Sequence, residues 1–229
     1  MPLLDRTEPY VHPPTDLAII GFIGCDGVGT TTHAEYATEL FESHGLTVHN
    51  EWMRYEHYFS LPVLALGRLL RKTEVYGDPD NYQVPVHQFQ NSRLLENLYK
   101  YTLLKDQKRM VSRKFKSTPN DTDALISDRF ILDGLVDLAV SLKDVSLLDS
   151  HIGQEFWELV PSQAVLIGLD CDADTIASRR PDVAPDPWLE LRVEAYRKVF
   201  EDNSINVVDT SQPIDEAKRE VERIIEAKS

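Results

Sequence analysis

Residues 16–32 have the sequence DLAIIGFIGCDGVGTTT. Its first eight residues are an apolar, β-branched run that is typical of a buried parallel strand, and residues 31–43 have the periodicity of an amphipathic helix. Between them, Gly24, Gly29 and Thr31 satisfy the pattern G-x-x-x-x-G-K-[ST], with Thr30 in the lysine position. A glycine-containing loop between a strand and a helix points backbone N–H groups at a phosphate, so this stretch predicts a phosphate-binding loop.

Thr30, in place of the usual lysine, is the departure from the phosphate-loop pattern that matters for activity. The usual lysine supplies a mobile cation between the outer phosphates, which a neutral hydroxyl cannot replace. Thr31 is placed to meet Mg²⁺ through its hydroxyl, and Thr32 is the next residue into the helix. The alternative interpretation is a glycine-rich turn that binds no ligand.

Composition limits the function classes. With 229 residues, 42% of them hydrophobic, we expect a polar N-terminal arm over 1–16 and one domain over 17–229. The formal charge of −14 and a pI near 4.9 argue against a general nucleic-acid partner or an anionic membrane surface. No apolar run has membrane length. Cys25 and Cys171 are far apart, which favours two reduced thiols and a cytoplasmic location.

Strand-like and helix-like segments alternate along the chain. This alternation predicts an α/β fold, a doubly wound parallel sheet of five strands with helices on both faces. The expected strands are 16–23, 46–53, 124–128, 164–169 and 206–209, and the expected helices include a long one over 84–115. We expect residues 73–82 to form a linker. Segments 54–83 and 179–187 are expected to cover a site at the strand ends, the second of them as a short lid.

The chain resembles the thymidylate kinases, a branch of the P-loop nucleoside-monophosphate kinases, and most of all the divergent archaeal-type members. The resemblance runs in order over about residues 17–227. It rests on GCDGVG at 24–29, FQNSR at 89–93, ISDRF at 126–130, LDCD at 169–172, Arg179-Arg180 with the later Tyr196, and VDTS at 208–211. It implies a P-loop NTPase fold, ATP and Mg²⁺ as cofactors, and phosphorylation of dTMP to dTDP.

The resemblance also implies roles for particular residues. The ATP phosphates would meet the loop at Gly24, Asp26, Gly27, Val28, Gly29, Thr30, Thr31 and Thr32. Catalytic positions would be Asp128, Arg129, Arg179 and Arg180, and the metal would be held by Thr31 and Asp128. The acceptor would contact Asp26, Arg54, Phe89, Arg93 and Arg129, with Phe89 stacked on the thymine ring and Arg93 at its edge on the same helix face.

Several alternatives stay open on sequence alone. Asp128-Arg129 could be a structural ion pair, Phe89 a core residue, Asp26 part of an Asx-turn, and Arg179-Arg180 a solvated helix end. Arg54 lacks the sequence that usually surrounds the family's phosphate-binding arginine. His33, His44, His49, His57 and His87 show no metal-ligand spacing and are expected on the surface or on helix faces. The chain could also be a nucleotide-binding protein without catalysis or a kinase of another small acceptor. In either case it could form a homodimer.

Overall fold

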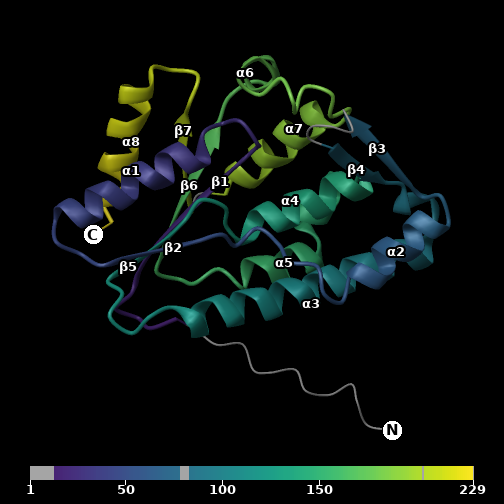
Figure 1. Cartoon of the computed structure of the whole chain (residues 1–229), viewed down its shortest axis with the longest axis horizontal. Helices are drawn as coiled ribbons and strands as arrows, with labels where there is room; N and C mark the ends of the chain where they lie inside the picture. The colour runs from purple at the N-terminus through teal and green to yellow at the C-terminus, as the bar shows by residue number, and fades with distance from the viewer. Residues whose placement is uncertain (1–12, 78–82, 203, 229) are drawn as a thin grey trace, which may run out of the picture.

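A five-stranded parallel sheet forms the centre of the molecule (Figure 1). The structure is a computed structural model that describes residues 13–77, 83–202 and 204–228. The strand order is β2-β5-β1-β6-β7, and every neighbouring pair is parallel. The strands are β1 (Ala18–Gly24), β2 (Val48–Glu51), β5 (Ala124–Ser127), β6 (Ala164–Asp170) and β7 (Ile205–Asp209). The predicted α/β class and the five strands are confirmed, while residues 1–12 of the expected arm lie outside the described residues.

Helices cover both faces of this sheet. On one face α1 (Thr30–Ser43) packs against β1, β2, β5 and α8 (Ile214–Glu226). On the other face α4 (Ile131–Leu142) packs against β1 and against α3 (Arg93–Ser117), α5 (His151–Trp157) and α7 (Leu189–Phe200). The remaining helices are α2 (Leu61–Leu69), α6 (Ala173–Arg179) and the short 3₁₀ helices η1 (Phe89–Asn91) and η2 (Val145–Asp149). None of the described helices is long and apolar enough to cross a membrane.

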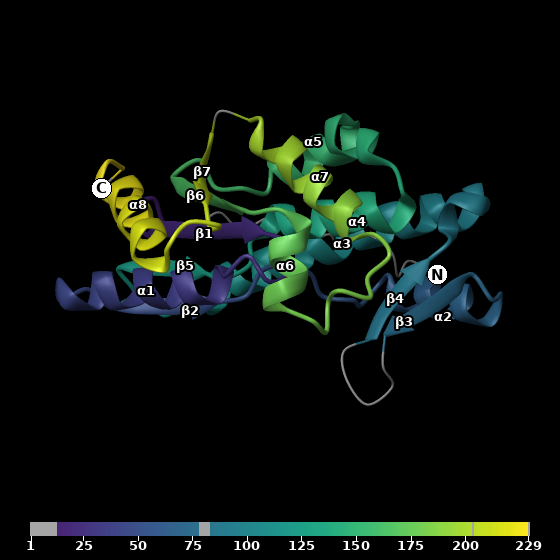
Figure 2. The same cartoon turned by 90° about the horizontal axis from the view of Figure 1, so that it is seen from above.

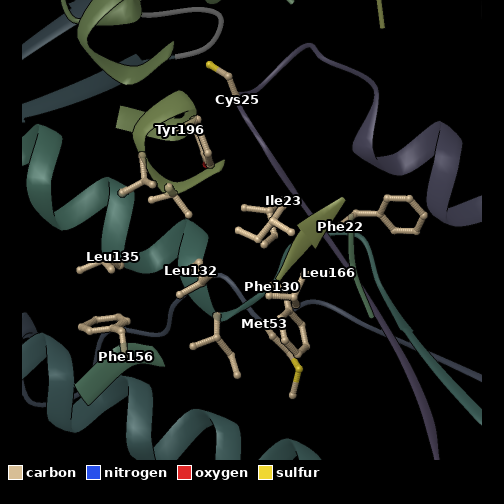
Figure 3. Packing of buried hydrophobic residues seen from close by; sticks show 14 of the residues in the cluster. Phe22, Ile23, Cys25, Met53, Phe130, Leu132, Leu135, Phe156, Leu166 and Tyr196 are labelled. Carbon is tan, nitrogen blue, oxygen red and sulfur yellow. The ribbon is translucent and has the colours of Figure 1, made fainter. Parts of the chain in front are cut away.

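The core extends over both faces of the sheet. Figure 3 shows Ile23 of β1 on the side of Phe130, Leu132 and Leu135, which lead into and form α4, while Phe22 points to the opposite side of the sheet. All five side chains are fully buried. Apart from its two aspartates and one serine, α4 is apolar on all sides, as expected for a helix that is covered all round.

Two segments differ from the sequence prediction. Residues 73–77 and 83–87 form the antiparallel pair β3 (Thr73–Gly77) and β4 (Gln83–His87) instead of a linker and a helix start. The long helix therefore begins at Arg93 rather than at residue 84. Pro85 cannot donate a helical hydrogen bond, and the alternating TEVYG and QVPVH runs flank a Gly-Asp-Pro-Asp turn signal, so the hairpin was detectable in the sequence.

The strand order places the predicted motifs side by side. The chain leaves β1 towards β2 on one side, and β6 extends the sheet on the other side, so β1 lies where the winding reverses. Ligands of open α/β sheets bind beyond the carboxyl ends of the strands at such a point. Here the loop after β1 and the residues after β5 meet at that edge, while α2, β3 and β4 lie at the end of the molecule opposite α1 and α8 (Figure 2).

Candidate phosphoryl-transfer site

The loop after β1 has the backbone that a phosphate-binding loop needs. Gly27 and Gly29 have φ angles of 101° and 99°, which side chains other than glycine rarely adopt. Gly29 is the N-cap of α1, so the loop leads directly into the positive end of a 14-residue helix. A Cβ at Gly27 would lie 3.2 Å from side-chain carbons of Arg180 and Ile176, so glycine also allows α6 to approach closely.

Thr31 and Asp128 come together as the sequence predicted. The Thr31 hydroxyl donates to Asp128 Oδ2 at 2.8 Å, which joins the first turn of α1 to the residue after β5. A hydroxyl and a carboxylate are the oxygen ligands that Mg²⁺ prefers. Both side chains border the cavity above the loop, so this donor set fits a magnesium ion held between loop and strand end.

A cavity of about 700 Å³ opens above the phosphate loop. It is bordered by loop residues 26–32, by the β7–α8 segment and by the guanidinium-bearing residues Arg54, Arg129, Arg179 and Arg180. Thr30 lies among the lining residues, and its side chain is buried at 4% exposure. The cations that face this cavity therefore come from three other elements rather than from the loop itself.

The two lid arginines have different partners. Arg180, at the end of α6, makes a two-pronged ion pair with Asp182 at 2.7 and 2.8 Å. Arg179 instead donates to the Thr210 carbonyl at 2.6 Å and lies 3.9 Å from the Cys171 sulfur. Within the described part of the chain no carboxylate pairs with Arg179, so its charge is the less neutralised of the two.

Asp26 lies between two buried arginines. Its carboxylate accepts from Arg54 Nη1 at 3.0 Å and from Arg129 Nη2 at 2.6 Å. Burial raises the pKa of Asp26, but the Arg129 and Arg54 guanidinium groups outweigh burial and hold the pKa at about 2. The carboxylate is therefore ionised at neutral pH. Arg54, expected to hold an acceptor phosphate, is already saturated by carboxylates in this arrangement.

Asp133 joins Arg129 to the phosphate loop and to α7. It is fully buried, and its oxygens accept from Arg129 Nη1 at 3.2 Å, from the Gly24 amide at 3.3 Å and from the Tyr196 hydroxyl at 2.7 Å. Arg129 also donates to the Gly24 carbonyl. Burial raises the pKa of Asp133, and Arg129 opposes this rise. These contacts fix the arginine of the ISDRF motif against the start of the loop.

Asp137, one turn further along α4, connects Arg54 to α7, as Asp133 connects Arg129 to α7. It accepts from Arg54 Nη2 at 2.8 Å and from Arg192 Nη1 at 2.6 Å. Arg192 also pairs with Asp186 at 3.4 Å. Burial raises the pKa of Asp137, but Arg54 more than offsets this and leaves the pKa below its usual value. Because Asp186 belongs to the α6–α7 connection, residues 180–188 (the lid connection), Arg192 ties that connection to α4.

A second cavity of about 110 Å³ lies on the far side of Asp26 and Arg54. Its lining combines rings with carboxylates: Asp26, Arg54, Tyr55, His57, His87, Tyr99, Leu103, Asp137, Ser141, Val183, Asp186 and Arg192. Burial lowers the pKa of His57 and brings that of His87 to about 4, so both rings are neutral at pH 7. His57 and His87, predicted to lie on the surface or on helix faces, thus border this cavity instead.

The structure does not bring Phe89 and Arg93 together as predicted. Phe89 lies in η1 with no exposed surface, stacked on His87 at 5.0 Å between ring centroids and edge-on to Tyr99 at 5.2 Å. Arg93 begins α3 and is exposed. The prediction of a shared helix face is wrong, because residues 73–87 form the hairpin and α3 begins only at Arg93, which leaves Phe89 in η1 with its ring in the core.

Sequence reasoning missed Asp133, Asp137, Asp186 and Arg192. A signal for two of them was present, since Asp133 and Asp137 are spaced by one turn inside the apolar helix ILDGLVDLAVSL. Carboxylates on a helix that is buried all round require cationic or hydrogen-bonding partners. Their partners on α7 could not be identified, because the contact joins segments more than 50 residues apart.

No protein-family model matches the chain, and no curated protein matches it by sequence. Among solved structures it is similar to the deoxyadenosine kinase from M. mycoides with bound dCTP, with a TM-score of 0.52 and 14% identity over 91% of this chain and 99% of that one. The same kinase with bound dATP gives a TM-score of 0.47 and 17% identity, over 91% and 98%.

The first likeness shows the fold. The chain has the α/β fold of P-loop kinases, a five-stranded parallel sheet flanked by helices. The comparison therefore confirms the fold that the resemblance implied and gives no support to its thymidylate branch.

Proposed function

We propose that the chain transfers a phosphoryl group from ATP to a hydroxyl group of a nucleoside-type acceptor. The observation that carries this proposal is that Asp26 and Arg54 border both cavities, the one above the phosphate loop and the smaller one lined by rings. A donor phosphate chain and an acceptor placed in the two cavities would meet at this shared wall. Phosphoryl transfer needs such placement and positive charge more than covalent help.

On the donor side, the loop amides and the N-terminus of α1 would bind the phosphates of ATP. Thr31 and Asp128 would hold Mg²⁺, which when bound neutralises phosphate charge. Arg129 points from the strand end into the same cavity and is fixed by Asp133. Arg179 is the cation best placed to supply the charge that Thr30 lacks, because it lines the cavity and no described carboxylate forms an ion pair with it.

The acceptor cavity favours a neutral acceptor over a phosphorylated one. Three carboxylates, Asp26, Asp137 and Asp186, border it together with two arginines, Arg54 and Arg192. Each arginine is already paired with two of these carboxylates. A monophosphate would have to displace a buried carboxylate or add further negative charge, whereas sugar hydroxyls can donate to the same oxygens.

The acceptor can enter only if the lid connection moves. The cavity of about 110 Å³ is smaller than the roughly 300 Å³ at which common ligand pockets begin. Val183 and Asp186 of the lid connection line it, so displacement of that connection enlarges it. Once the acceptor is bound, Asp26 can accept a hydrogen bond from the reacting hydroxyl. With a pKa of about 2, Asp26 orients this hydroxyl rather than acting as a strong base.

The dTMP expectation is the second candidate. Its motif order and the four arginines at the larger cavity favour it. Its base-recognition pair does not, since Phe89 is in the core and Arg93 is exposed. A test of the function therefore has to include both neutral nucleosides and dTMP as acceptors.

A coupled assay for ADP release tests the proposal with deoxyadenosine, thymidine, deoxycytidine and dTMP as acceptors. We expect turnover with at least one nucleoside, at a kcat/KM at least about tenfold above that for dTMP. Asp128→Asn should abolish this turnover, while Asp121→Asn, in an exposed loop, should leave it unchanged and so exclude a contaminating kinase. Preference for dTMP would reject the neutral acceptor. ATP binding without turnover on any acceptor would identify a non-catalytic nucleotide-binding protein.

A further inference from the structure

The segment between Arg54 and α2 is fastened to α3 by one buried carboxylate. Asp106 of α3 is 2% exposed, and it accepts hydrogen bonds from the backbone N–H groups of Tyr58, Phe59 and Ser60 at 3.0, 2.6 and 2.9 Å. The Ser60 hydroxyl lies 2.6 Å from the same carboxylate. Because a buried carboxylate is stable only when its oxygens are bonded, these four contacts fix the turn against α3.

Ser60 connects this anchor to His57. Both Asp106 oxygens already accept backbone N–H groups, so the Ser60 hydroxyl is the donor in its contact with Asp106. A serine hydroxyl has one proton to donate, and its oxygen therefore accepts at its second contact, which is 2.8 Å from His57 Nδ1. The neutral His57 ring thus carries its proton on Nδ1. Ser60 has no exposed surface, so water does not compete for this contact.

The other ring nitrogen of His57 is left as a hydrogen-bond acceptor. A neutral imidazole with its proton on Nδ1 has a lone pair on Nε2. Among the described residues, no group donates to His57 Nε2. His57 lines the smaller cavity, whereas Ser60 does not. Nε2 is therefore the nitrogen of this ring that can bind a ligand in the cavity.

The charges around His57 also favour a ligand that donates. Burial lowers the pKa of His57, and the carboxylates of Asp106 and Asp137 oppose this effect, which places negative charge near the ring. Asp137 itself lines the smaller cavity. The Tyr55 ring packs beside His57, with 5.0 Å between the ring centroids. A planar ligand that presents N–H groups to this end of the cavity is favoured over one that presents carbonyl oxygens.

Nucleobases differ in what they present to such an acceptor. An exocyclic amino group, as in adenine and cytosine, carries two N–H donors at the edge of the base. The ring N–H of thymine or uracil lies between two carbonyl oxygens, and their lone pairs would face Nε2 and the nearby carboxylates. The end of the cavity at His57 therefore matches an amino-bearing base.

We propose that Asp106 and Ser60 are positioning residues that fix His57 Nε2 as a hydrogen-bond acceptor, and that this acceptor selects nucleosides whose base carries an amino group. The inference rests on the proposed function, because it takes the smaller cavity as the acceptor site. Neither Asp106 nor Ser60 lines that cavity or the larger one, so both act through His57.

The tautomer of His57 is measured by two-bond proton–nitrogen NMR of the full chain with isotope-labelled histidine, in which His57→Gln identifies the signals. The wild type should carry the proton on Nδ1. Ser60→Ala removes the partner of Nδ1, so the proton should move to Nε2, as in a free histidine side chain. Ser117→Ala, an exposed serine at the end of α3, should change nothing. A proton on Nε2 in the wild type, or an unchanged tautomer in Ser60→Ala, would overturn the proposal.

Selectivity is measured with deoxyadenosine and deoxynebularine, which differ only in the amino group. In the wild type, kcat/KM for deoxyadenosine should exceed that for deoxynebularine by about tenfold or more. His57→Phe and Ser60→Ala should bring the two values within about twofold of each other and leave the KM for ATP unchanged. His57→Gln should keep part of the selectivity, because its amide oxygen can accept near the position of Nε2. Circular dichroism checks that each variant is folded.

Calorimetric titration with the same two nucleosides separates this inference from the proposed function. Tighter binding of deoxyadenosine without phosphoryl transfer would reject the kinase and support selection by His57. Phosphorylation of both nucleosides with equal kcat/KM would overturn the selection and leave the kinase standing. Selectivity that survives in His57→Phe, a preference for thymidine over deoxyadenosine, or no binding of either purine nucleoside would also overturn it.

Discussion

Under the proposed function, the residues that matter most at the phosphate loop are Thr30, which stands in the lysine position, and Arg179, which lines the same cavity. Thr30 contributes no charge, and Arg179 has a carbonyl and a sulfur as its neighbours rather than a carboxylate. Arg180 is tied to Asp182, 46% exposed, and is screened by water. The two arginines therefore have different partners, and under the proposed function Arg179 is the one expected to replace the missing lysine charge.

Arg179→Ala should lower kcat by about 10²–10³ while changing ATP affinity little, because its charge is needed most in the transition state. Arg180→Ala is the matched control and should lower kcat less than about tenfold. Steady-state kinetics with separate ATP titrations measure both. Equal losses for the two variants, or an unaffected kcat for Arg179→Ala, would remove Arg179 from the mechanism.

Thr30→Lys tests the same role of Arg179 by restoring the lysine of the usual phosphate-loop pattern. If Arg179 already supplies the charge, a lysine at this buried position should change kcat by less than about tenfold. It should restore most of the loss when combined with Arg179→Ala. An unrescued double variant would mean that the two positions serve different steps.

Asp26 links stability to pH. Its pKa falls from 3.8 to about 2 in the folded protein, so the ionised form is favoured by folding. The resulting stability, on the order of 2 kcal/mol, is present above pH 4 and is lost as pH falls towards 2. The lowered pKa of Asp137 acts in the same direction.

Urea unfolding between pH 7 and pH 2.5 should therefore show a decline in the free energy of unfolding that is shallower in Asp26→Asn than in the wild type. At pH 7 the variant should be less stable by about 3 kcal/mol, since Arg54 and Arg129 lose a buried partner. Asp121→Asn should keep the wild-type slope. A variant as steep as the wild type would assign the acid sensitivity to other carboxylates.

The loop and the strand ends were predictable residue by residue because their signals are local. Gly24, Gly29 and Thr31 stand at fixed spacing, and Asp128 follows an apolar strand, so parallel pairing alone brings Thr31 and Asp128 together. Phe89 was not predictable in this way. Its burial depends on the hairpin that precedes it and delays the start of α3 to Arg93, and its neighbours His87 and Tyr99 come from two different elements.

The α4 and α7 helices form a ladder that joins the lid connection to the phosphate loop. Asp133 and Asp137 on α4 face Tyr196 and Arg192 on α7, each pair one helical turn apart. Both connections end on Asp26, through Arg129 and Arg54 respectively. Amphipathic periodicity predicted both helices but could not predict this pairing, because it depends on how they cross.

Arg192→Met should disturb the acceptor side alone. Removing the guanidinium frees Asp186 of the lid connection and leaves Asp137 with one partner, so we expect the KM for the acceptor to rise about tenfold or more while the KM for ATP stays within about twofold. Asp186→Asn should have a smaller effect of the same kind. If Arg192 acts through Asp186, the double variant should be little worse than Arg192→Met. Full additivity in this double-mutant cycle would show that the two residues act independently.

Charge is distributed unevenly over the whole molecule. Residues 61–72 and 93–116, which include α2 and nearly all of α3, have a net charge of +9, so the other residues together have a charge of −23. Composition gave the total of −14 but not its arrangement, which depends on where these helices lie: α2 is at the end opposite α1 and α8, and α3 runs from there along the molecule (Figures 1 and 2). Like charges crowded on the acidic part repel each other and destabilise the compact state.

Salt should therefore stabilise this protein. Raising NaCl from about 0.05 to about 0.5 M shortens the Debye length enough to screen repulsion among exposed carboxylates, while the buried Asp26–Arg54–Asp137 pairs are screened little. We expect the free energy of unfolding in urea to rise on the order of 1 kcal/mol. Glu39→Gln with Glu42→Gln, two exposed positions on α1, should raise stability at low salt and reduce the response to NaCl. Choline chloride should act like NaCl if screening is the cause, whereas a response to NaCl alone would point to bound sodium, and a fall in stability with either salt would mean that surface ion pairs outweigh the repulsion.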